Sequence, residues 1–66
     1  HAAYDSSSDL KAMVRANLVA ERIAVESYRQ MIALIGDKDP TTRRMLESIL
    51  NDEEEHAEEM KDLLEE

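Results

Sequence analysis

A glutamate and a histidine at three-residue spacing, Glu53 and His56, are the residues of this 66-residue sequence most suited to chemistry. On a helix, residues three apart share one face, so this carboxylate and this imidazole can converge on one metal ion. The sequence contains no Cys, and oxygen-rich ligation with some imidazole and no sulfur suits iron or manganese better than a structural zinc. The spacing therefore predicts that Glu53 and His56 are metal ligands.

Glu21 is the candidate third ligand. It lies on a stripe of apolar residues that recur at three- and four-residue steps through the first half of the chain, where an ionised carboxylate is costly unless it is paired or metal-bound. If the second half folds back as a helix, Glu21 lies within a turn or two of Glu53. Glu26 is expected to face outward. Tyr28 and Asn17 share the stripe and are interpreted either as ordinary contacts or as hydrogen-bond partners of a ligand.

Two helices are expected to position these residues. Ser6 and Asp9 form a capping-box pattern ahead of the first apolar run, and Gly36 suits a helix end. Asp39 is a good N-cap, and Pro40 fits a first helical position. The expected elements are a helix over about 10–35, a turn over 36–39 and a helix over about 40–64. Because the connection is short, the fold class predicted is all-α, an antiparallel helical hairpin.

The apolar stripes are too broad for a hairpin to cover by itself. On the first helix the main stripe is Leu10, Met13, Val14, Ala24, Met31 and Ile35, flanked by Leu18, Val25 and Ile32. On the second helix it is Leu46, Ile49, Leu50, Ala57, Met60, Leu63 and Leu64. The usual remedy is a four-helix bundle. The expected partner is a second hairpin, supplied either by a second copy or by the N-terminal half of a longer parent chain, with further oligomerisation expected.

Composition excludes several other classes. The 16 acidic and 8 basic residues give a net charge of −8, and there is no basic stripe of the kind that nucleic-acid binding needs. No apolar run approaches the ~20 residues of a membrane span. The absence of Cys fits a reducing compartment such as the cytoplasm. Nine of the acids lie within 51–66, where Lys61 is the lone base, and this acidic face is expected to concentrate cations near the site.

From about residue 17 to 64, the sequence resembles the C-terminal half of a bacterioferritin-like protein of the ferritin-like superfamily. The segments that carry the resemblance are NLVAER (17–22), DPTTRR (39–44) and, most specifically, ILNDEEEH (49–56). The resemblance implies that residues 1–66 are a single half-domain, comprising the third and fourth helices of a four-helix bundle. Residues 1–9 are then the end of the crossover that precedes the third helix.

The resemblance also implies a function. Glu21 and His56 look like terminal ligands of one iron, and Glu53 like the carboxylate that bridges two irons, with manganese or zinc as substitutes. Once assembled with a second half-site, such a protein is a ferroxidase that oxidises Fe(II) for iron storage or detoxification. None of the Met residues matches the haem ligand of bacterioferritins, so no haem ligand is assigned. The alternatives are a rubrerythrin-like or encapsulated-ferritin relative and a metal-free hairpin that serves only for dimerisation.

Overall fold

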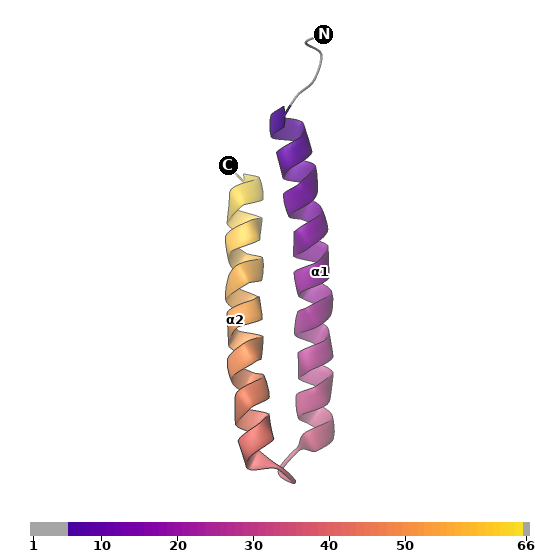
Figure 1. Ribbon diagram of the computed structural model, residues 1–66, viewed down its shortest axis with the longest axis vertical. Coiled ribbons are helices and arrows are strands. Elements are labelled where there is room, and N and C mark those ends of the chain that lie inside the picture. The colour runs from indigo at the N-terminus through magenta and orange to yellow at the C-terminus, as the bar shows by residue number, and fades with distance from the viewer. Residues whose placement is uncertain (1–5, 66) are drawn as a thin grey trace.

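The structure, a computed structural model, describes residues 6–65 and consists of two long helices joined by a tight turn (Figure 1). Helix α1 spans Ser6–Ile35 and helix α2 spans Pro40–Glu65. The two helices run antiparallel and pack side by side, which confirms the predicted all-α hairpin. Neither of these helices is both long and apolar enough to cross a membrane.

Helix α1 begins four residues earlier than the sequence predicted. The segment that was expected to precede the helix forms its first turn instead, where Asp9 is the acidic residue and interacts favourably with the positive end of the helix dipole. The helix ends at Ile35, just before Gly36, as predicted, because Gly36 takes a left-handed φ of 54° that glycine adopts without strain. Its N–H donates to the carbonyl of Ile32 over 3.0 Å. The first five residues, part of the expected crossover, lie outside the described residues.

Helix α2 begins with the cap that the sequence predicted. The Asp39 carboxylate accepts hydrogen bonds from the Thr42 hydroxyl (2.7 Å) and from the Thr42 backbone N–H (3.1 Å). These two bonds, the hydroxyl's first, lower the pKa of Asp39, because they stabilise the ionised carboxylate. Arg43 holds the turn from the other side, since its Nη1 donates to the carbonyl of Gly36 at 3.0 Å and lies 3.4 Å from Asp37.

The seam between the helices is narrow. Its buried apolar residues are Leu18, Val25 and Leu46. Of the main stripe predicted for α1, Leu10, Met13 and Met31 are 61%, 63% and 39% exposed, whereas Val14, Ala24 and Ile35 are half-buried. The two residues of α1 that are buried, Leu18 and Val25, are ones that the sequence placed at the flank of the stripe. Periodicity gave the apolar side of the helix, but only the position of α2 decides which edge of that side is covered.

Candidate metal centre

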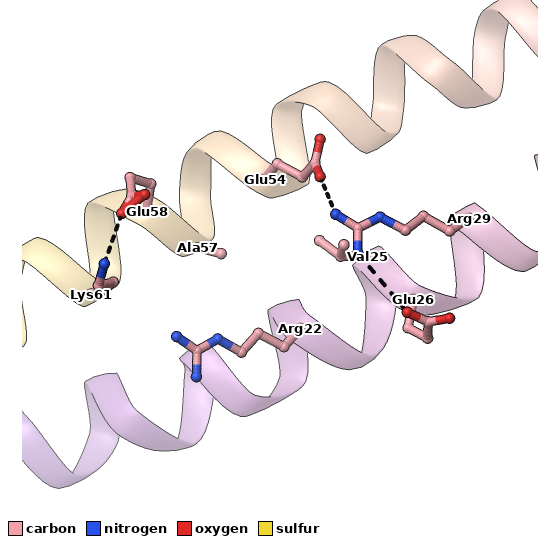
Figure 2. Close-up of a pocket in the computed structure, with 8 residues that line it drawn as sticks. All are labelled: Arg22, Val25, Glu26, Arg29, Glu54, Ala57, Glu58 and Lys61. Carbon is pink, nitrogen blue, oxygen red and sulfur yellow. Dashed lines mark hydrogen bonds and ion pairs between the residues drawn. The ribbon is translucent and has the colours of Figure 1, made fainter.

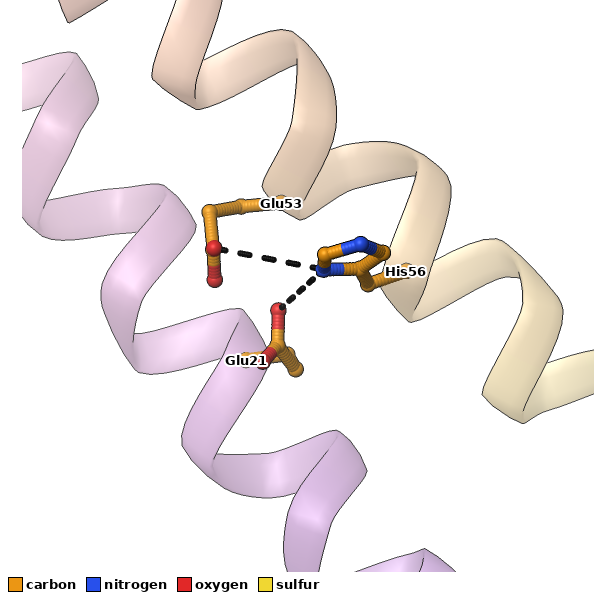
Figure 3. Close-up of side chains that lie close together, drawn as sticks. All are labelled: Glu21, Glu53 and His56. Atoms are coloured by element: carbon orange, nitrogen blue, oxygen red, sulfur yellow. Dashed lines mark ion pairs between the residues drawn. The ribbon is translucent and has the colours of Figure 1, made fainter.

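The three predicted ligands lie together halfway along the hairpin (Figure 3). Glu21 extends from α1, and Glu53 and His56 extend from neighbouring turns of α2 toward it. The Nδ1 atom of His56 lies 3.8 Å from Oε2 of Glu21 and 4.0 Å from Oε1 of Glu53. Each residue offers one donor atom, and all three atoms lie within 4.8 Å of one another. The sequence therefore identified which residues gather, and their role as metal ligands stays a prediction.

Their position follows from the fold. Fifteen residues of α1 precede Glu21 and fourteen follow it. Thirteen residues of α2 precede Glu53 and twelve follow it. Because the turn is short and the helices are antiparallel, the midpoints of both helices lie at the same height, and the three-residue spacing of Glu53 and His56 keeps both on the α1-facing edge of α2. The cluster is therefore held by two rigid helices, far from their ends.

The electrostatics of the cluster favour a cation. The side chains of Glu21 and Glu53 are only 22% and 23% exposed, whereas His56 is 54% exposed. The pKa of Glu21 is raised, first by a hydrogen bond that the protonated carboxyl shares with Glu53, then by desolvation and by the negative charge of Glu53; His56 opposes the rise. The Oε2 atom of Glu21 is inaccessible to solvent and has no hydrogen-bond partner among the described residues. A bound cation would therefore stabilise two neighbouring carboxylates, one of which has a buried oxygen that accepts no hydrogen bond.

The spacing of the donors fits a first-row transition-metal ion. Such ions hold imidazole nitrogen and carboxylate oxygen at about 2.0–2.2 Å, taking the values for zinc, so two donors of one ion lie at most about 4.4 Å apart. The 3.8 Å and 4.0 Å separations from His56 to Glu21 and Glu53 are inside this limit. The donor atoms of Glu21 and Glu53 lie within 4.8 Å of each other.

The other polar residues predicted on or near the stripe do not join the cluster. Glu26 is exposed, as predicted, and lies 4.0 Å from Arg29 one turn along α1. Asn17 is exposed and Tyr28 is half-buried. Its half-buried position is consistent with an aromatic at the edge of the core, and a role as hydrogen-bond partner of a ligand stays a prediction.

On the opposite side of the seam, the structure shows a contact that the sequence did not reveal. Nη2 of Arg29 donates to Oε2 of Glu54 over 2.6 Å and joins the helices (Figure 2). The two residues belong to a groove lined by Arg22, Val25, Glu26, Arg29, Glu54, Ala57, Glu58 and Lys61. None of the three clustered ligands lines this groove, and its acidic and basic side chains are equal in number, so the cluster is the better candidate site. The opposite charges of Arg29 and Glu54 were visible in the sequence, but their pairing depends on the register of the helices.

Fold and cluster together define a class of protein. A hairpin that presents one Glu opposite a Glu-x-x-His pair matches half of the inward-facing ligand set of carboxylate-bridged four-helix bundles. The family model of the ferritin-like domain matches residues 1–66, and the chain belongs to this family of helical, generally iron-binding proteins. A search of curated proteins found no match. The more specific resemblance to bacterioferritins stays a prediction.

Proposed function

We propose that this chain supplies half of a di-iron ferroxidase centre that oxidises Fe(II) for iron storage or detoxification. The observation that carries the proposal is the cluster itself: two largely buried carboxylates and one imidazole offer donor atoms within 4.8 Å of one another, and the inner oxygen of Glu21 has no hydrogen-bond partner among the described residues. Membership of the ferritin-like family supports iron as the metal. Oxygen and imidazole donors without sulfur are also the donor set that iron accepts.

Each residue has a distinct role in this proposal. Glu21 and His56 would hold one iron, and Glu53 would be the carboxylate that this iron shares with a second one. The bound Fe(II) would supply the electrons that reduce dioxygen or peroxide. The chain's own contribution is to neutralise the metal charge with two carboxylates and to leave His56, half-exposed, at the mouth of the cluster. The surrounding acids, which include Asp52, raise the local concentration of cations.

Fe(II) oxidation in air tests the proposal. Ferric absorbance is followed after Fe(II) is added to the chain at several concentrations, so that assembly is included in the measurement. We expect oxidation faster than in buffer, loss of that excess rate in Glu53→Gln, and retention of it in Glu54→Gln. The control carries the same change in charge one residue away, on the groove side of the seam. An oxidation rate equal to that of buffer, or equal losses in the two variants, contradicts the proposal.

The exposed apolar residues beside the cluster also support a second candidate, a metal-free hairpin that only dimerises. In that case Glu53→Leu and His56→Leu stabilise the assembly, because a buried polar layer is often less stable than an apolar one. The ferroxidase proposal instead expects a metal-dependent gain, about 2.7 kcal/mol when the free metal is 100 times the dissociation constant. Thermal unfolding of the wild-type chain and Glu53→Leu, with and without Mn²⁺, separates the two candidates.

A further inference from the structure

A second stripe of α1 points away from both α2 and the cluster. It is centred on Ile23, which at 100° per residue lies about 160° around the helix from the buried Val25 and from Glu21. Val19, Ile23 and Leu34 in this stripe are large apolar residues that are 58%, 63% and 81% exposed. The whole stripe, which we call the back face, is exposed and consists of Ala12, Ala16, Val19, Ile23, Ser27, Gln30 and Leu34.

The back face carries no charge. Between residues 10 and 35, the charged residues of α1 other than Glu21 fall within a sector of about 60° on the side of the groove. They are Lys11, Arg15, Arg22, Glu26 and Arg29. Single apolar residues are common on protein surfaces, but a continuous uncharged face with three large apolar side chains is typical of a contact surface.

The serine near the middle of the back face is suited to burial. The hydroxyl of Ser27 donates a hydrogen bond of 2.9 Å to the backbone carbonyl of Ile23, one turn earlier in the same helix. A hydroxyl that is buried without a partner destabilises a contact, whereas one that bonds to its own helix does not depend on water. Another surface can therefore cover Ser27 without the loss of a hydrogen bond.

The back face is symmetric about Ile23, because Ala12 and Leu34 lie eleven residues on either side of it. Val19 and Ser27 lie four residues on either side. In an antiparallel pair of α1 helices centred on Ile23, Leu34 of each copy therefore lies opposite Ala12 of the other. In the same way Val19 lies opposite the smaller Ser27. Because large residues face small ones, the two helix axes can approach to about 8–10 Å.

The charges along one edge of the back face are complementary to those of a second copy. Arg22 forms no hydrogen bond or ion pair with any residue of 6–65 (Figure 2). Glu26 lies 4.0 Å from Arg29, which already pairs with Glu54 at 2.6 Å. Arg22 lies one residue before Ile23 and Glu26 lies three residues after it. An antiparallel copy therefore brings each Arg22 to within about 3 Å of the level of Glu26 on the other helix.

These features together favour one occupant. We propose that a second copy of this chain packs on the back face, antiparallel to the first, with a twofold axis at Ile23. The axis keeps the edge that carries Arg22 and Glu26 on the same side in both copies, so two symmetric ion pairs form. Because the back face points away from Glu21, the contact leaves the cluster uncovered. The inference goes beyond the proposed function and does not depend on iron binding.

Disulfide trapping tests the position of the axis. The sequence has no native Cys, so a cross-link reports only the introduced residue. Ile23→Cys is expected to form a covalent dimer on mild oxidation, because this residue meets its own copy at the axis. Ser27→Cys is the matched control on the same face, since its two copies are separated by about 12 Å along the helices. Equal cross-linking of the two variants overturns the proposed axis.

The double variant Val19→Cys/Ser27→Cys tests the register independently. Within one chain these residues are about 12 Å apart along α1, which exceeds the Cα separation of about 7 Å that a disulfide spans. A covalent dimer is expected for the double variant and not for either single variant. The trapped fraction should decrease on dilution, because one helix packed on one helix buries less than the about 1,200 Å² of a stable interface. The absence of a cross-link at every chain concentration overturns the pairing.

Charge reversal tests the contact of Arg22 with Glu26. Arg22→Glu and Glu26→Arg, each introduced into Val19→Cys/Ser27→Cys, are expected to reduce the trapped fraction about threefold or more, because like charges then face each other at two symmetric positions. Combining both reversals is expected to restore trapping, while circular dichroism confirms that helix content is unchanged. A combined variant that is trapped no better than the single reversals contradicts the antiparallel arrangement.

The pairing and the proposed function can fail separately. Ile23→Lys is expected to abolish trapping and to leave Fe(II) oxidation unchanged. Leu10→Lys is the matched control, because Leu10 is 61% exposed and lies about 140° around α1 from Ile23; it is expected to leave trapping intact. Equal loss of trapping in both variants overturns the pairing. Trapping without Fe(II) oxidation contradicts the proposed function and leaves the pairing, and oxidation without trapping does the reverse.

Discussion

The narrowness of the seam leads to a quantitative prediction from two valines of α1. Val25 is 8% exposed and lies in the seam, whereas Val19 is 58% exposed and lies on the outer side. Val25→Ala and Val19→Ala each remove two methyl groups from the middle of the same helix. Because the chemical change and the gain in helix propensity are the same, any difference between the variants reports the packing of α1 against α2 alone.

The expected difference follows from burial. Removing two groups at about 0.8 kcal/mol each, scaled by the buried fraction, costs about 1.5 kcal/mol at Val25 and about 0.7 kcal/mol at Val19. The higher helix propensity of alanine offsets up to about 0.6 kcal/mol of this loss at both positions. Val19→Ala is therefore close to neutral, and Val25→Ala destabilises by about 1 kcal/mol, or more if the seam does not collapse around the lost volume.

Urea unfolding monitored by circular dichroism at 222 nm measures both variants against the wild-type chain. Chain concentration and metal content are held constant, because association changes the apparent stability. The urea concentration at the midpoint of unfolding is expected to decrease for Val25→Ala and to remain unchanged for Val19→Ala. The slope of the unfolding free energy against urea concentration is expected to be the same for both. Equal shifts for the two variants, or a larger shift for Val19→Ala, refute the assignment of the seam to the edge of the apolar stripe that contains Val25.

Three further predictions concern the charges and the turn. The raised pKa of Glu21 means that the folded chain binds a proton more tightly than the unfolded chain, so the stability of the metal-free chain decreases as pH rises from about 4.5 through the folded pKa. Unfolding free energies measured from pH 4 to 7 should show this decrease. The decrease should be smaller in Glu53→Gln. The half-exposed pair of Arg29 and Glu54 should show a coupling of about 0.2–1 kcal/mol in a double-mutant cycle that weakens in high salt, and a coupling insensitive to salt contradicts that assignment. Gly36→Ala should cost about 1–2 kcal/mol in thermal unfolding, because its φ is +54° while the nearest atom to an added Cβ lies at 3.9 Å; a neutral result means that the turn relaxes.

Local sequence signals predicted the ends of the helices well. Gly36, Asp39 and Pro40 act through their own backbone geometry and nearest neighbours, so the turn was predicted to the residue. The start of α1 was less accurate, because the serines near the N-terminus fit either a cap or a first helical turn. The seam was predicted least well, since Met31 and Val25 belong to the same broad apolar stripe and only the position of the second helix decides between them.

Which residues gather at the candidate site could also be predicted from local sequence patterns. Glu21, Glu53 and His56 are polar residues at positions where helical periodicity expects apolar ones, and a short turn fixes which positions of two antiparallel helices are level. The sequence could not give the separation of the side chains or the unpartnered oxygen of Glu21, because both depend on rotamers and on the distance between helix axes. The contact of Arg29 with Glu54 could not be predicted from the sequence either, because it depends on the same rotamers and helix separation.

The placement of the two helix ends has a consequence for any single chain that contains two such hairpins. Ser6 and Glu65 lie at the same end of the hairpin (Figure 1). When a second hairpin packs end for end against the first, the last residue of one and the first residue of the other are separated by the full length of the helices. At 1.5 Å per residue, α2 alone is about 39 Å long, and an extended connection of at least about 12 residues is needed to span it. A tandem fusion with a short linker would therefore force exchange of hairpins between chains, whereas a long linker would allow one chain to close the bundle by itself.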